Sequence, residues 1–225
     1  MTSQPGSPDI QQSDALKLLA LLLMTVDHAG AILLPQVLWL RYIGRLAFPL
    51  FAYQLATGYL HTHSVRRYAG RLALWGVIAQ PIYAAAFGRG WWNLNIFATL
   101  LLGLLAIWGW DHRRWWAVAV ALLLPLVQLR YPSIGPDYGV YGVLLCLSGF
   151  VLRRDKRLLC AGQLLLHAMA AAFLWPSQIF AVCSLPFLLY PPRCRKHLPG
   201  TLFYAYYPAH LAVFILLRHL SLLRR

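Results

Sequence analysis

The sequence predicts an all-α polytopic membrane protein, a single bundle of about nine transmembrane helices with a range of eight to ten. Three observations support this fold class. The 225 residues are 60% hydrophobic and only 12% charged, and the mean hydropathy is +0.59, more apolar surface than one soluble core can absorb. Apolar runs of roughly 17 to 25 residues, the length that spans a bilayer, follow one another along the chain. Basic residues recur at alternate breaks between the runs.

The expected spans can be assigned one by one from these runs. They are 15–34, 38–60, 68–87, 94–110, 115–131, 138–152, 157–174, 176–190 and 201–219. The sixth and eighth are short and rich in Gly and Pro, so one span can be broken or re-entrant. Residues 1–13 are polar with Pro, Gly and Ser, and we expect a short disordered cytoplasmic tail there. Residues 14–225 then form one transmembrane helical domain, since no linker composition separates a second one.

The charge distribution predicts an orientation. The chain holds 20 Lys and Arg against 6 acidic residues, a formal charge of +14. In this apolar context we expect basic loops that touch anionic lipid, and no nucleic-acid partner. With a cytoplasmic N-terminus, four inner loops in succession carry basic clusters, near residues 66–71, 113–114, 153–157 and 193–196. The basic C-terminal residues then fall outside and break the rule, so the exact helix count and the side of the C-terminus stay open. The four cysteines show no metal-binding spacing, and we expect neither a metal nor a disulfide.

The first span contains ionisable residues that lipid does not favour. Lys17 and His28 are eleven residues apart, which places them on one helix face and about 16 Å apart along the axis. An ionisable group near the bilayer centre costs at least about 2.5 kcal/mol and usually marks a functional site. Asp27 points about 100° away from His28, because adjacent helical residues do not face each other. Asp27 therefore needs a cation from another helix.

The second span offers two such cations. Arg41 and Arg45 are four residues apart and share one face near the outer end. A pair between Asp27 and either arginine would offset part of the desolvation cost of both charges. The alternatives are a purely structural clamp between helices, or an Arg41 that reaches the lipid headgroups.

Further polar residues lie where a membrane cavity would need them. Tyr206 and His210 share a face of the last span, near the helix-kinking Pro208. The remaining cavity candidates are Asn95, at the start of the fourth span, and Asp137 and Tyr141, at the outer start of the sixth.

Several stretches, taken together and in order, resemble one known family. They are "DALKLLALLLMTVDHAGAI", "WLRYIGRLAFPLFAYQLATGYLHT", "YAGRLALWGVIAQPIY", "LNIFATLLLGLLAI", "DYGVYGVLL" and "YAYYPAHL". This sequence is similar to the TraX family, the F-pilin acetylation proteins of conjugative plasmids, and among its members to the TrbP proteins of IncP-type systems. The spacing of Lys17 and His28 also resembles the basic residue and histidine of membrane acyltransferases that acetylate sugars. The resemblance covers nearly the whole chain beyond residue 13.

The resemblance implies an acyltransferase-like fold and an acetyl-CoA-dependent N-acetyltransferase activity. It implies a multi-pass protein of the cell inner membrane that acts in pilin maturation during conjugation. It implies His28, Asp27 and Arg45 as catalytic residues. We expect Lys17, Arg66, Arg67 and Arg71 to bind the CoA phosphates and pantetheine arm. The partners would be acetyl-CoA, the bilayer, and a pilin or other envelope acceptor.

The sequence leaves several alternatives open. His28 can act as general base or as an acetylated relay. The acceptor can be a pilin amine, a pilin hydroxyl or another molecule, and the oligomeric state is not predicted. A non-catalytic membrane assembly factor of the conjugation apparatus and a small transporter are the alternative functions, although no internal repeat of the transporter kind is visible.

Overall fold

The computed structural model describes residues 8–192 and 200–223, and these are helical almost throughout. In chain order the elements are α1 (Pro8–Ile32), α2 (Leu38–Gly44), α3 (Ala47–His61), α4 (Val65–Phe87), β1 (Asn93–Leu94), α5 (Ile96–Asp111), α6 (Trp115–Leu123), the 3-10 helix η1 (Leu124–Leu126), α7 (Val127–Arg130), β2 (Gly135–Pro136), α8 (Gly139–Val151), α9 (Lys156–Phe173), the 3-10 helix η2 (Pro176–Ser184), α10 (Leu185–Leu189) and α11 (Gly200–Leu223).

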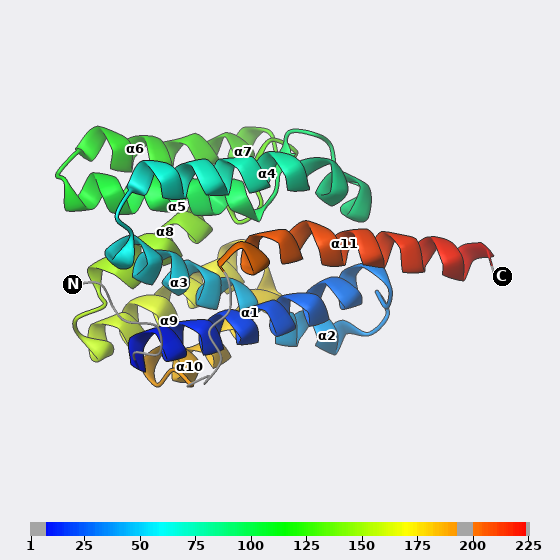
Figure 1. Cartoon of the computed structure of the whole chain (residues 1–225), viewed down its shortest axis with the longest axis horizontal. Helices are drawn as coiled ribbons and strands as arrows, with labels where there is room; N and C mark the ends of the chain where they lie inside the picture. Colours follow the sequence, from blue (N-terminus) through cyan, green and yellow to red (C-terminus); the bar gives the residue numbers. More distant parts are fainter. Residues whose placement is uncertain (1–7, 193–199, 224–225) are drawn as a thin grey trace.

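Each expected apolar run corresponds to one helical pass. The second run forms α2 and α3, the fifth forms α6, η1 and α7, and the eighth forms η2 and α10, so these three passes are broken helices. The passes lie side by side along the long axis of the molecule, and their connections fall alternately at its two ends (Figure 1). The all-helical bundle is therefore confirmed.

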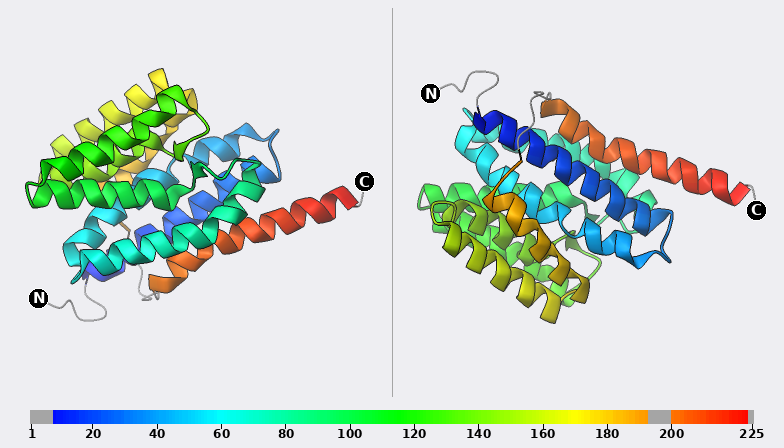
Figure 2. Two further views of the ribbon diagram at one scale, coloured as in Figure 1. Left: turned by 90° about the horizontal axis from the view of Figure 1, so that it is seen from above. Right: turned by 90° about the horizontal axis from the view of Figure 1, so that it is seen from below.

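In the part of the chain that the structure describes, two helices are long and apolar enough to cross a membrane by length and composition. These are residues Asp14–Ile32 within α1 and Gly200–Leu220 within α11. Four other apolar helical stretches are shorter: Ile96–Asp111, Trp115–Arg130, Gly139–Val151 and Pro176–Leu189. Helix length thus supports two spans, and the nine-span count stays a prediction. Views from above and below show α11 continuing past the other helices at its C-terminal end (Figure 2).

The outer surface of the bundle is unusually apolar. Val77, Leu129 and Phe173 are each at least 74% exposed, and many other large apolar side chains are exposed on the same helices. Soluble proteins rarely expose continuous apolar surface on this scale. Together with the two candidate spans, this surface indicates a membrane protein.

The N-terminal part of α1 differs from the expectation. The helix begins at Pro8, six residues before the predicted start of the helical domain at 14. Residues 1–7 lie outside the described part of the chain, so a disordered tail stays a prediction for them. The same holds for the fourth basic loop, because residues 193–199 are also outside it.

A glycine lets α2 approach α1 closely. A Cβ atom at Gly44 would lie 2.2 Å from the Cβ of Asp27, closer than two carbons can pack. Only glycine fits this position, and the close approach places the arginines of α2 and of its C-terminal end next to Asp27.

Candidate functional site

Two cavities enter the bundle from opposite ends and adjoin inside it. One, of about 760 Å³, extends from the α3–α4 connection and is lined by Lys17, Arg67 and Arg71 among others; we call it the inner cavity. The other, of about 230 Å³, is lined by residues that include Asp27, His28 and Asp137; we call it the outer cavity. Four residues line both cavities: Met24, Phe51, Ile96 and Tyr207. We call these four the waist.

A buried ion cluster forms one wall of the outer cavity. The Asp27 carboxylate accepts a hydrogen bond from Arg41 Nη1 at 2.5 Å and from Arg45 Nη2 at 3.0 Å. Asp27 is only 7% exposed, and the Arg45 side chain is 11% exposed. The ion pair that the sequence predicted is therefore present, with both arginines on one carboxylate. Such an arrangement offsets the cost of burying each charge.

His28 pairs with a second histidine from α11. His28 Nδ1 and His210 Nε2 are 2.7 Å apart, and His210 Nδ1 lies 2.8 Å from the carbonyl oxygen of Tyr206. A carbonyl only accepts, so His210 Nδ1 carries a proton, and in a neutral ring its Nε2 is an acceptor. His28 Nδ1 must then be the donor. The lone pair of His28 is left on Nε2, which makes no hydrogen bond within the described part of the chain.

The rings around His28 hold it in place. Phe87 and Tyr207 meet the imidazole edge-on, with centroid distances of 5.2 and 6.0 Å, and the plane of the His210 ring is parallel to it, with a centroid distance of 5.0 Å. These contacts come from α4 and α11. His28 therefore has a fixed orientation beside the waist, with one nitrogen bonded and the other available as a proton acceptor.

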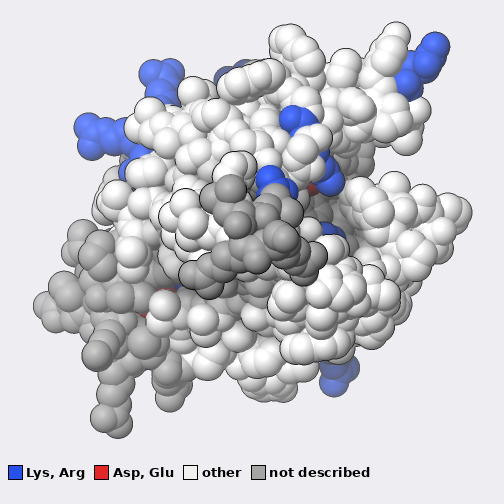
Figure 3. All heavy atoms as spheres, turned by 90° about the vertical axis from the view of Figure 1, so that its right-hand side faces the viewer, with Lys and Arg blue, Asp and Glu red and all other residues white. Residues whose placement is uncertain are grey.

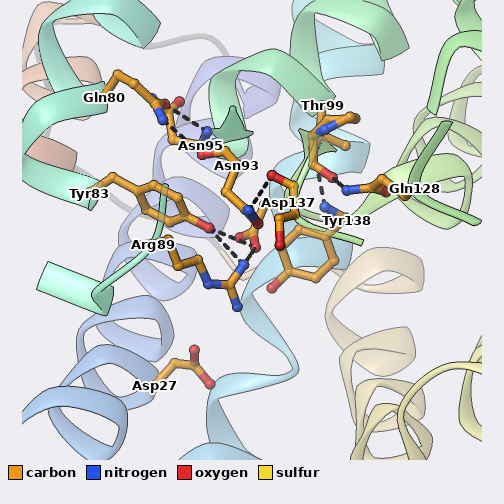
Figure 4. A network of polar contacts seen from close by, with 12 residues as sticks. Asp27, Gln80, Tyr83, Arg89, Asn93, Asn95, Thr99, Gln128, Asp137 and Tyr138 are labelled. Atoms are coloured by element: carbon orange, nitrogen blue, oxygen red, sulfur yellow. Dashed lines mark hydrogen bonds and ion pairs between the residues drawn. The ribbon is translucent and has the colours of Figure 1, made fainter. Parts of the chain in front are cut away.

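The opposite wall of the outer cavity is built from the loops after α4 and after α7. Tyr83 donates to Asp137 Oδ1 at 3.0 Å, and Arg89 donates to the same oxygen at 3.2 Å. Residues 93–94 and 135–136 pair as a short parallel ladder, which brings the two loops together (Figure 4). Gln80 fastens the first loop to α4 by donating to the carbonyl of Asn93 at 2.7 Å.

The inner cavity carries basic and imidazole groups at its mouth. Arg67 and Arg71 line it, and so do His61 and His63, which the sequence gave no role. Lys17 also lines it, but its ammonium is 3.0 Å from the Asp14 carboxylate. Arg66, the fourth expected phosphate ligand, is exposed and does not line the cavity.

Four of the expected cavity residues line neither cavity: Asn95, Tyr141, Tyr206 and His210, the partner of His28. Asn95 is 2% exposed and caps the N-terminus of α5 by accepting from the Phe97 amide at 3.0 Å. Tyr206 bonds to the Thr25 hydroxyl at 2.7 Å. Tyr141 belongs to a separate buried polar cluster between α8, α9 and η2. The sequence placed these residues at a membrane cavity, but in the structure their side chains contact neighbouring helices instead.

The Tyr141 cluster supports a prediction about stability. Gln178 Nε2 donates to the Tyr141 hydroxyl at 2.8 Å, so that hydroxyl donates in turn to His167 Nδ1, also 2.8 Å away. Tyr141→Phe removes the partner of both groups and is expected to cost about 1–3 kcal/mol of unfolding free energy. Thermal unfolding of the detergent-solubilised protein measures it. Tyr131→Phe, at a half-exposed tyrosine, is the matched control, and equal midpoints for the two variants would contradict the prediction.

The geometry defines a class of protein: an apolar helical bundle with a histidine and an ion cluster where two oppositely directed cavities meet. The family model described as TraX protein matches residues 12–218, and the chain belongs to the TraX family.

Individual relatives cover most of the chain. It is 31% identical to a probable fimbrial assembly protein FimC, serogroup H1, of Dichelobacter nodosus, over 88% of this chain and 92% of that protein. It is also 31% identical to the protein TraX of Escherichia coli, over 90% of this chain and 85% of the relative. No solved structure matches the fold.

Proposed function

We propose that this chain is a multi-pass inner-membrane acyltransferase that moves an acetyl group from acetyl-CoA to a pilin amine or hydroxyl. The observation that carries the proposal is the placement of His28, with a free Nε2, where the two cavities adjoin. A donor entering from one end and an acceptor entering from the other would meet beside this nitrogen. The family assignment and the fimbrial name of one relative support a pilin as the acceptor.

The charge distribution supports a cytoplasmic inner cavity. The basic residues near 66–71, 113–114 and 153–157 belong to connections at the same end of the bundle as the inner cavity mouth (Figure 1). By the positive-inside rule this end faces the cytoplasm, where acetyl-CoA is made. The outer cavity then faces the side on which a processed pilin presents its terminus.

The inner cavity fits the donor in size and in charge. Its 760 Å³ lie within the range of about 300–1,000 Å³ for small-molecule sites. Arg67 and Arg71 would bind phosphate oxygens at the mouth, where guanidinium groups donate paired hydrogen bonds. Lys17 lies deeper on α1 and would contact the pantetheine arm, its charge shared with Asp14. Acetyl-CoA supplies an activated thioester.

His28 performs the proton transfer in this mechanism. Its Nε2 takes the proton of the acceptor N–H or O–H as the acceptor atom forms a bond to the thioester carbonyl carbon. The carbon–sulfur bond then breaks, and His28 returns the proton to the departing sulfur as a thiol. His210 keeps His28 in the correct tautomer, and Asp27 with its two arginines stabilises the wall beside it.

Intact mass of mature pilin tests the reaction. Pilin from cells with this protein should be heavier by one acetyl group than pilin from cells without it, and a plasmid copy of the gene should restore the heavier form. Equal masses would instead favour the assembly role that the name of the fimbrial relative suggests.

A further inference from the structure

The outer cavity contains more positive than negative side chains. Its described lining includes three arginines, Arg41, Arg45 and Arg89, but only two carboxylates, Asp27 and Asp137. His28 is neutral in the hydrogen-bonding arrangement with His210. The described lining therefore has one positive charge in excess, and Arg41 and Arg45 share the single carboxylate of Asp27.

The hydrogen bonds show where this charge lies. Asp27 is occupied by Arg41 and Arg45 together, and Asp137 is occupied by Arg89 and Tyr83. The close-up shows Arg89 lying between Asp137 and Asp27 (Figure 4). On the Asp27 side of the cavity, two arginines share one carboxylate. An excess of buried positive charge is costly, so a ligand that supplies the missing negative charge would be stabilised there.

Arg41 has donors free for such a ligand. Its Nη1 donates two hydrogen bonds, one to the carboxylate and one to the backbone carbonyl of Asp27. Within the described part of the chain its Nε and Nη2 make none. The side chain is 31% exposed, against 11% for Arg45. A guanidinium with two adjacent free N–H groups matches the geometry of a carboxylate or phosphate.

We propose that the outer cavity binds an oxyanion, a carboxylate or phosphate carried by the acceptor, on Arg41 beside His28. The size of the cavity, about 230 Å³, suits a headgroup-sized portion of a molecule. The same chemistry can come from the headgroup of an anionic lipid. The oxyanion site itself is inferred from the charges and the free N–H groups of the cavity. Only the description of the ligand as the acceptor rests on the proposed function.

A binding experiment on the full chain tests this site without any acyl transfer. The thermal unfolding midpoint of the detergent-purified protein is measured in inorganic phosphate and in chloride at equal ionic strength. Phosphate should raise the midpoint of the wild type and of the control Arg130→Gln, whose arginine lies at the same end but lines neither cavity. Arg41→Gln should show a smaller rise, and any remaining rise is due to phosphate at Arg67 and Arg71 of the inner cavity, which this variant leaves unchanged. Arg89→Gln, at a more exposed arginine of the cavity, should weaken it and serves if Arg41→Gln does not fold.

A second experiment, with lipid vesicles, distinguishes the two possible sources of the oxyanion. The protein is reconstituted in phosphatidylcholine vesicles with and without phosphatidylglycerol. If phosphatidylglycerol stabilises the wild type but not Arg41→Gln, and phosphate has no effect, the ligand is the lipid headgroup. A phosphate effect that needs Arg41 identifies a free or acceptor-borne oxyanion. The site does not exist if neither probe stabilises the wild type, or if Arg41→Gln responds as the wild type does. Figure 3 shows the end of the molecule at which α11 finishes, where the described basic side chains are scattered over a mostly uncharged surface.

Discussion

His28→Ala is expected to abolish acetyl transfer, lowering the rate by at least about 10²-fold, the usual contribution of a general base. The protein should still fold and still bind the donor, because the arginines at the inner cavity mouth are unchanged. Acetyl-CoA-dependent labelling of pilin by membrane vesicles measures the rate. Labelling of the protein itself in the wild type, but not in the variant, would identify the relay route in place of the base.

Two further variants separate the chemical step from binding. Lys17→Ala should raise the Michaelis constant for acetyl-CoA with a smaller effect on kcat. His210→Phe should lower kcat and change its pH profile, since His28 loses the partner that fixes its tautomer. His112→Ala, at an exposed histidine between α5 and α6, is the control. A well-folded His28→Ala variant with normal transfer would show that the histidine is structural.

Asp27→Asn should have the largest effect on stability. It leaves Arg41 and Arg45 buried without their shared carboxylate, and losing one partner of a buried pair costs about 3–5 kcal/mol. The double variant Asp27→Asn with Arg45→Gln should cost less than the sum of the single changes, with a coupling of about 0.5–3 kcal/mol. Unfolding in detergent measures all three.

Asp155→Asn provides the matched control for this cycle. Asp155 is an exposed residue that caps α9 by accepting from the Arg157 amide at 2.8 Å, and asparagine caps helices equally well. The change should therefore be nearly neutral. Strictly additive effects of the Asp27 and Arg45 changes would show that the two side chains do not interact in the folded protein.

The sequence predicted the helical passes and one of the two central contacts. Apolar run length identified each pass, and the i, i+4 spacing of Arg41 and Arg45 correctly placed both on the face that meets Asp27. Periodicity specifies which face of a helix is buried, but not which helix covers it. For that reason the contact between His28 and His210, 182 residues apart, was missed, although each residue was singled out separately.

The same limit explains the other differences. Asn95 and Tyr141 point inward as predicted, but their partners are Gln80 and His167, supplied by helices whose neighbours a single sequence does not specify. His61 and His63, which the sequence gave no role, are exposed residues at the connection between α3 and α4. They line the inner cavity because the connection between α3 and α4 folds over its mouth, a tertiary arrangement without a local signal.

The waist has a consequence for the energetics of the cell. If the bundle crosses the membrane as proposed, two wet compartments approach each other within it, and a continuous water column would dissipate the proton gradient. Met24, Phe51, Ile96 and Tyr207 line this junction with three apolar side chains and one phenol. Hydrophobic constrictions of this kind block ions by excluding water. Such a plug would keep the bilayer insulating while leaving two bound molecules close enough to exchange a small group.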